Sequence, residues 1–213
     1  MILRPDFYVQ DNSDPVALRR EMGLHEGLTT AIALFGGHGS KAIYEITEKL
    51  DAAGLPLQLI LICGRNEELA GKLRARQWKL PVHVIGFTKE VHRLMHAADF
   101  LIGKPGPGSI AEAMVRQLPV LIECNAWTLP QERYNAEWVK EKGVGIVLKS
   151  FENVLNGVRR MLDPAAFSEF RKNVMAQNNR AVFEIPEILA KLLGEPNSIT
   201  ARTARVPVEA ETR

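Results

Sequence analysis

The chain has 213 residues, a length that suits one α/β domain of ordinary size. Its 46% hydrophobic and 24% charged residues are typical of a globular protein, and a formal net charge of only +2 argues against a nucleic-acid groove. The two cysteines, Cys63 and Cys124, lack CxxC spacing and predict neither a zinc site nor a disulfide framework.

Strand and helix patterns alternate along the chain from residue 29. The first strand, 29–35, is a continuous apolar run, and a glycine loop at 36–39 and a helix to about residue 53 follow it. The pattern then predicts a strand at 57–63, a helix to about 78, a strand at 82–85, a helix at 90–97, a strand at 100–102, a glycine- and proline-rich loop at 103–108, a helix at 109–117, a strand at 120–122, a helix at 131–142, a strand at 145–148 and helices at 151–162, 165–178 and 186–193.

Six strands that alternate with helices predict an α/β, Rossmann-like, doubly wound parallel sheet with right-handed connections. Ligands of such sheets bind at the carboxyl ends of the strands, near the point where the strand order reverses. Both glycine loops follow strands, so both are expected at that edge. We predict a linker-like segment at 1–28, a folded domain at 29–193 and a disordered tail at 194–213.

No apolar run has the length of a signal peptide or a membrane-spanning helix, since the longest runs are strand-length. Together with the two unpaired thiols, this predicts a cytoplasmic protein in a reducing compartment.

The first glycine loop carries a phosphate-binding pattern. Gly37, Gly39 and Ala42 fit G-x-G-x-x-G/A between a strand and a helix, where backbone N–H groups and the helix N-terminus favour an anion. A dinucleotide site would also need a carboxylate at the end of the second strand, and residues 62–65 contain none, which argues against NAD. A tight turn that binds no ligand remains the alternative.

The second loop, KPGPGS at 104–109, places a cation, two glycines and two stiffening prolines before a helix. Gly106 and Gly108 suit close approach of a ligand to the backbone. Lys104 would offset phosphate charge, unless it is a solvated loop lysine. Ser109 is expected either to cap the helix or to bond a phosphate oxygen.

Glu112 lies four residues beyond Gly108, in what the pattern predicts to be the first turn of the helix. A carboxylate there suits the helix dipole, which is a purely structural explanation. The functional interpretation is bidentate bonding to the two hydroxyl groups of a ribose, because a carboxylate only accepts hydrogen bonds.

A third polar stretch, 125–135, follows the fifth strand and is therefore expected at the same edge. Gln131, Glu132 and Asn135 lie on one face at the start of the next helix, at spacings that suit contacts with sugar hydroxyls. Ordinary capping of the helix is the alternative.

Taken together, GGHGS at 36–40, KPGPGSIAEA at 104–113 and QERYN at 131–135 resemble the loops of two-domain glycosyltransferases of the GT-B type. The likeness is strongest to the monogalactosyldiacylglycerol synthases and related diacylglycerol glycosyltransferases. A weaker likeness links the chain to the N-acetylglucosaminyltransferase that forms lipid II. The resemblance covers roughly residues 4–193.

The resemblance implies a role for each loop. In these families the first loop lies beside the diphosphate of a UDP-sugar, the segment after the third strand frames the uracil, the second loop binds phosphate and ribose, and the third stretch meets the sugar. The implied donor-site residues are Gly37, Gly39, Ser40, Phe87, Thr88, Lys104, Gly106, Gly108, Ser109, Glu112, Gln131 and Glu132. The chain contains no D-x-D pair, so no metal and no cofactor are expected, and the role of His38 stays open.

The resemblance also implies that this chain is the donor-binding half of an inverting glycosyltransferase. Residues 4–8 resemble the linker before the second domain, so the acceptor-binding domain is expected on another chain or missing, and the isolated chain is expected to be inactive. The implied reaction moves a hexose, galactose or glucose, to a lipid such as diacylglycerol, with membrane contact through the missing domain. A non-catalytic UDP-sugar-binding module and a UDP-sugar epimerase or hydrolase are the alternatives.

Overall fold

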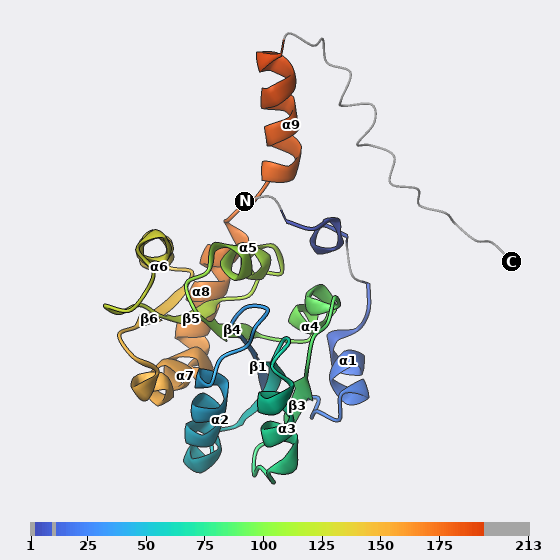
Figure 1. Ribbon diagram of the computed structural model, residues 1–213, viewed down its shortest axis with the longest axis vertical. Coiled ribbons are helices and arrows are strands. Elements are labelled where there is room, and N and C mark those ends of the chain that lie inside the picture. Colours follow the sequence, from blue (N-terminus) through green and yellow to red (C-terminus); the bar gives the residue numbers. More distant parts are fainter. Residues whose placement is uncertain (1–2, 10–11, 194–213) are drawn as a thin grey trace, which may run out of the picture. The chain divides into compact units, whose positions relative to one another are not determined.

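A single parallel sheet organises the main body of the molecule. The computed structural model describes residues 3–9 and 12–193, and within them six strands form one sheet in the order β3-β2-β1-β4-β5-β6 (Figure 1). The strands are β1 (Thr29–Leu34), β2 (Leu57–Ile62), β3 (Val82–Ile85), β4 (Phe100–Gly103), β5 (Val120–Glu123) and β6 (Gly145–Leu148). The predicted α/β, Rossmann-like parallel sheet is confirmed, and each strand lies within one residue of its predicted ends.

The central strands β1, β2, β4 and β5 are mostly apolar because both faces of the sheet are covered. Along β1 and β2, alternate side chains point to opposite faces, as the two-residue period of a strand requires. Ile32 and Ile60 join one core, in which α1, α4, α5 and α6 take part, while Ala31 and Leu59 join a second core with α2, α3 and α7. The core therefore consists of two layers separated by the sheet.

The helices of the main body, residues 3–178, are α1 (Pro15–Glu21), α2 (Ala42–Ala53), α3 (Glu67–Ala75), α4 (Val91–His96), α5 (Pro107–Val115), α6 (Pro130–Lys142), α7 (Val154–Leu162) and α8 (Pro164–Met175). Short 3-10 helices occupy η1 (Pro5–Phe7) and η2 (Phe151–Asn153). Residues 179–193 belong to a separate unit, which contains α9 (Ala181–Leu192). No helix in the described residues is both long and apolar enough to span a membrane.

Two predicted helix boundaries are wrong for identifiable reasons. The helix expected to reach residue 78 ends at Ala75, because the chain turns extended at Arg76 and the indole of Trp78 donates a hydrogen bond back to the Leu73 carbonyl (2.8 Å). The last helix starts at Ala181 rather than at Pro186, so this proline lies inside the helix. A proline favours the first turn of a helix, and the position of Pro186 therefore misleads a prediction from sequence.

Residues before 29 contain a helix that the alternation of strands and helices does not predict. Pro15 begins α1 after Asp14, whose carboxylate accepts a hydrogen bond from the Val16 N–H (3.0 Å). The segment packs into the core through buried residues on η1, on α1 and on the chain around them, which are Leu3, Phe7, Leu18 and Leu24. The division of the chain at residue 28 stays a prediction, and the predicted disordered tail at 194–213 lies outside the described residues.

Arg19 attaches this segment to the sheet. Its Nη2 lies 2.9 Å from Oδ2 of Asp99, and its Nε donates to the Ala97 carbonyl (2.8 Å). The same carboxylate oxygen accepts a hydrogen bond from the Thr30 N–H at the start of β1 (2.7 Å). Only 12% of the Arg19 side chain is exposed, so the ion pair is shielded from solvent and links α1 to two central strands.

Replacing this arginine should therefore destabilise the fold. We expect Arg19→Met to lower the free energy of unfolding by about 2 to 4 kcal/mol, because it leaves the Asp99 carboxylate without its cation. Urea denaturation measures the loss. Arg93→Met is the control, since its ion pair with Glu21 is exposed and should contribute less than about 1 kcal/mol. Equal effects of the two substitutions would contradict this role for Arg19.

Candidate functional site

The strand order reverses between β1 and β4, and the loops that follow these two strands meet at the carboxyl edge of the sheet. β1 pairs with β2 on one side and with β4 on the other, so the connections diverge from this point. A Cβ atom built on Gly36 would lie 3.8 Å from Cε of Lys104. The structure thus brings the two glycine-containing loops together at the place where open α/β sheets bind ligands.

Close backbone contacts fix the first loop. Gly39 has a left-handed φ of +65°, and a Cβ there would lie 2.3 Å from the Cys63 carbonyl oxygen. Gly64 has a φ of +58°, and its Cβ would lie 2.4 Å from the Gly37 carbonyl oxygen, which also accepts a hydrogen bond from the Arg65 N–H (2.9 Å). The loops after β1 and β2 therefore fit each other only with glycine at these two positions.

Gly37 differs from these two glycines. Its φ is not in the left-handed region, and no atom lies within 4 Å of a Cβ built on it. Protein packing therefore does not require glycine here, whereas close approach of a ligand to the exposed backbone would. Ser40, at the end of the loop, accepts a hydrogen bond from the Ala42 N–H at its Oγ (3.3 Å).

The helix after the second loop begins earlier than predicted. Pro107 is the first residue of α5 and Gly106 is its N-cap, so the expectation that Ser109 caps the helix is wrong. The Ser109 hydroxyl instead donates to the Gly106 carbonyl (3.2 Å). Glu112 becomes the sixth residue of the helix, and the first turn contains no acidic residue. Because the dipole effect fades after the first turn, it does not explain this carboxylate.

Glu112 is half-buried within α5, beyond its first turn. Its carboxylate makes no hydrogen bond or salt bridge within the described part of the chain. Burial raises the pKa of this carboxyl group above its ordinary value, and the nearby positive charge of Arg4 opposes the shift. The fold thus keeps a carboxylate where it costs stability, which is a recurring property of binding sites.

The third stretch docks on the second loop. Lys104 Nζ lies 3.2 Å from Oε1 of Glu132, whose side chain is 12% exposed, and the Asn135 amide donates to the Pro105 carbonyl (2.9 Å). Lys104, which was predicted to bind phosphate, and Glu132, which was predicted to bind the sugar, therefore form an ion pair in this structure. Gln131 is exposed beside them, and Gly108 has no atom within 4 Å of a built Cβ.

The predicted uracil-framing residues lie farther along the same edge, after β3. Phe87 is 55% exposed, and the guanidinium carbon of Arg65 lies 5.2 Å from its ring centroid. Thr88 accepts a hydrogen bond from the Glu90 N–H before α4 (3.0 Å). Arg65 is absent from the predicted site, although its position directly after the second strand was a signal that a cation lies at this edge.

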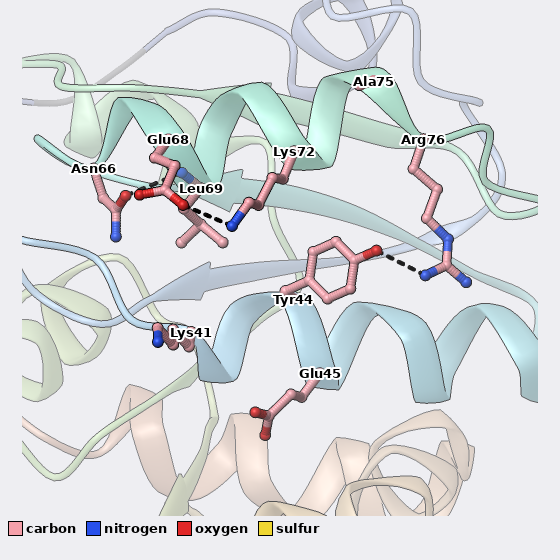
Figure 2. Close-up of a pocket in the computed structure, with 9 residues that line it drawn as sticks. All are labelled: Lys41, Tyr44, Glu45, Asn66, Glu68, Leu69, Lys72, Ala75 and Arg76. Atoms are coloured by element: carbon pink, nitrogen blue, oxygen red, sulfur yellow. Dashed lines mark hydrogen bonds and ion pairs between the residues drawn. The ribbon is translucent and has the colours of Figure 1, made fainter.

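A groove of about 550 Å³ runs between α2 and α3, beside the first glycine loop (Figure 2). Lys41 and Asn66 mark its end near the sheet edge. Its other cations are already paired, Lys72 with Glu68 and Arg76 with the Tyr44 hydroxyl and with Glu48. The groove therefore adjoins the crevice at β1 and β4 without replacing it as the candidate site.

No group of three or more His, Cys, Asp or Glu side chains that could hold a metal ion is found among the described residues. The expectation that neither a metal nor a cofactor takes part stays a prediction.

Comparison with known proteins identifies relatives over nearly the whole chain. The model of the glycosyltransferase family 28 C-terminal domain matches residues 31–191. Monogalactosyldiacylglycerol synthase of Spinacia oleracea is 38% identical over 204 residues, which is 90% of this chain and 38% of that protein. Monogalactosyldiacylglycerol synthase 1 of Arabidopsis thaliana is 35% identical over 213 residues, which is 92% of this chain and again 38% of the relative.

Two solved structures share the fold at low sequence identity. WaaG, a glycosyltransferase involved in lipopolysaccharide biosynthesis, aligns with a TM-score of 0.62 and 22% identity over 89% of this chain and 54% of its own. Anabaena HepE in complex with UDP-glucose aligns with a TM-score of 0.62 and 18% identity over the same shares of the two chains. These likenesses confirm that the sheet and its helices form one half of a GT-B fold.

The unpartnered carboxylate predicts a stabilising substitution. Because folding raises the pKa of Glu112, its cost is fully present above the folded pKa and disappears below the ordinary glutamate value of 4.5. We expect Glu112→Gln to raise the thermal midpoint at pH 7 by up to about 3 °C, with the gain vanishing below about pH 4.5. Thermal melts across pH measure it, and Glu132→Gln, which breaks the ion pair with Lys104, should give no gain. A loss of stability in Glu112→Gln at pH 7 would contradict the assignment.

Proposed function

We propose that this chain, which belongs to the glycosyltransferase family 28 C-terminal domains, binds the UDP-sugar donor of a lipid glycosyltransferase in the crevice between β1 and β4. The observation that carries the proposal is the half-buried, unpartnered Glu112 carboxylate beside two loops suited to a diphosphate. The names of the curated relatives, monogalactosyldiacylglycerol synthases, support transfer of a sugar to a lipid, and the UDP-glucose complex of Anabaena HepE supports a UDP-sugar as the donor.

The diphosphate would lie against backbone N–H groups of two loops. Gly37 leaves its backbone open to a ligand, and the first turn of α5 offers the N–H groups of Gly108 and Ser109, which have no partner within the helix. Lys104 lies at the same point and would neutralise part of the phosphate charge. Ser40 and Ser109 would add hydroxyl donors, while Phe87 and Thr88 after β3 would frame the uracil.

Glu112 would accept hydrogen bonds from both ribose hydroxyls. A vicinal diol offers two donors and a carboxylate offers two acceptor oxygens, so the pair satisfies both groups. The ligand would then compensate the desolvation that raises the pKa of this carboxyl group in its absence. The stability lost by holding this carboxylate in place is recovered as donor affinity.

Gln131 and Glu132 would contact the hydroxyls of the sugar. Glu132 is anchored through its ion pair with Lys104, so its position is fixed relative to the phosphate-binding loop. Lys104 would thus contact the leaving diphosphate and also orient Glu132, the side chain that binds the sugar. A galactose or glucose donor follows from the relatives, since the residues themselves suit several hexoses.

The reaction is an inverting transfer. The acceptor hydroxyl attacks the anomeric carbon, the bond from that carbon to the diphosphate oxygen breaks, and UDP leaves. Lys104 and the α5 N-terminus would stabilise the charge that develops on the diphosphate. The hydroxyl proton would pass to a base on the acceptor-binding domain, with a diacylglycerol-type lipid as acceptor. The chain spans 38% of the length of the two relatives described above, so this partner domain is part of the proposal.

Two substitutions should separate ribose from phosphate recognition. Lys104→Met is expected to weaken UDP binding about tenfold and to leave uridine binding unchanged, because it removes only a charged contact with phosphate. Glu112→Gln should weaken both ligands about tenfold or more. Titration calorimetry with UDP and uridine measures both. Equal UDP affinity in wild type and Glu112→Gln would contradict the proposal that Glu112 binds the ribose. A folded chain that binds no UDP would refute the proposed function.

Gly37 offers an independent test of backbone approach to the ligand. Gly37→Ala should change the free energy of unfolding by less than about 0.5 kcal/mol, since its Cβ meets no protein atom, yet weaken UDP binding several-fold. Gly71→Ala on α3 is the matched control, because its Cβ is also uncrowded, and it should leave UDP affinity unchanged. Unaltered affinity in Gly37→Ala would show that the ligand does not approach this backbone.

A further inference from the structure

The loop between β5 and α6 and the first turns of α6 expose three large apolar side chains, which we call the aromatic tip. It consists of Trp127, Leu129 and Tyr134, whose exposed fractions are 93%, 50% and 68%. Trp127 has the largest exposed fraction of the large apolar side chains in the described residues. Isolated exposed apolar residues are common, but three within eight positions suggest an interaction surface.

The aromatic tip is built on a rigid turn. The Thr128 N–H donates to the Asn125 carbonyl (3.1 Å), and the Asn125 side chain accepts from the Trp127 N–H (2.9 Å). The Asn125 N–H donates in turn to the Thr128 hydroxyl (2.9 Å). Three short contacts thus fix the backbone on both sides of Trp127, so its exposure is a property of the turn rather than of a loose loop.

Arg133 fastens this turn to α6. Its guanidinium donates to the Thr128 carbonyl through Nε (3.1 Å) and to the Ala126 carbonyl through Nη2 (2.9 Å). Residues 125–129 carry no charge, and the first carboxylate beyond them, on Glu132, is paired with Lys104. The segment that carries Trp127 is therefore uncharged, and the exposed cation of Arg133 is held against it.

The partner of this surface follows from the proposed function, on which this inference rests. The hydroxyl of a diacylglycerol-type acceptor lies at the membrane–water interface, and transfer requires it to contact the anomeric carbon of the donor. The carboxyl edge of the sheet must therefore approach the interface. Trp127 and Leu129 follow β5 at that edge and directly precede Gln131 and Glu132, and Tyr134 follows these two residues on α6. Tryptophan and tyrosine favour this interface, and leucine inserts below it.

We propose that Trp127, Leu129 and Tyr134 insert into the interfacial layer of a lipid bilayer and hold the donor edge of the sheet against the membrane. Membrane contact would then reside partly in this chain, in addition to the contact that the resemblance implies for an acceptor-binding domain. The rigid turn would set the depth and orientation of the donor site relative to the acceptor.

The test uses the whole chain and phosphatidylcholine vesicles that contain diacylglycerol, with and without brominated acyl chains. Brominated lipid should quench tryptophan emission of the wild type, and Trp127→Phe should abolish the quenched component because Trp78 and Trp138 are partly buried. In sedimentation, Trp127→Ala should lower the vesicle-bound fraction about fivefold, and Trp127→Phe should retain most of it. Met175→Ala, which truncates an exposed side chain on α8, is the control.

Absence of quenching at Trp127, or equal vesicle binding by Trp127→Ala and wild type, would overturn the proposal. The UDP affinity of Trp127→Ala in vesicle-free buffer should equal that of wild type, and a loss there would show that the residue serves the donor site instead. Quenching in a chain that binds no UDP would refute the proposed function and would still support membrane insertion of the aromatic tip. UDP binding without quenching would refute the membrane surface alone.

Discussion

The reversal of strand order between β1 and β4 is the constraint on which the site depends. Because the chain leaves these neighbouring strands in opposite directions, their loops part and leave a crevice at the carboxyl edge. Gly36 and Lys104 face each other across this point, although 68 positions separate them in the sequence. Every residue proposed to bind the donor belongs to a loop or helix start at that edge, or to the turn of α5 that follows it.

Two kinds of glycine serve this crevice in different ways. Gly39 and Gly64 allow the loops after β1 and β2 to touch, so they are required by the fold itself. Gly37 has free space around it, so the fold does not require glycine there, and the proposed ligand would explain this glycine by its approach to the backbone. Glu112 belongs with Gly37, since the carboxylate has no hydrogen-bond or ion-pair partner in the described residues and its desolvation outweighs the charge of Arg4. Positions that the fold does not need are the strongest physical indication of a binding site in this chain.

Much of the fold follows from local sequence patterns. Short, mainly apolar runs identify all six strands, because the central strands are buried on both faces, and glycines mark several of the loops that follow them. The start of α5 is harder to predict, since Pro107 suits both a stiff loop and the first turn of a helix. This ambiguity led to the expectation that Glu112 lies in the first turn. The helix α1 has its own signal in Asp14 and Pro15, but an isolated seven-residue helix breaks the strand–helix alternation.

The contacts between side chains within the site were harder to predict from the sequence. Lys104 and Glu132 are 28 residues apart, and no local pattern reports that they form an ion pair. The same is true of Arg65 and Phe87, which meet because β2 and β3 are neighbours in the sheet. Resemblance to a family suggested which residues serve the donor, whereas the three-dimensional arrangement shows which of them hold one another in place.

The most direct measurement of the central claim is a titration of the chain, labelled with ¹⁵N at glycine, with UDP, followed by amide chemical shifts. If the donor occupies the crevice, the amide signals of Gly37, Gly39 and Gly108 should move together and saturate at one affinity, while those of Gly71 and Gly157, on α3 and α7, stay in place. Saturable binding that leaves the crevice glycines unmoved would contradict the account, because the ligand would then occupy a different part of the molecule.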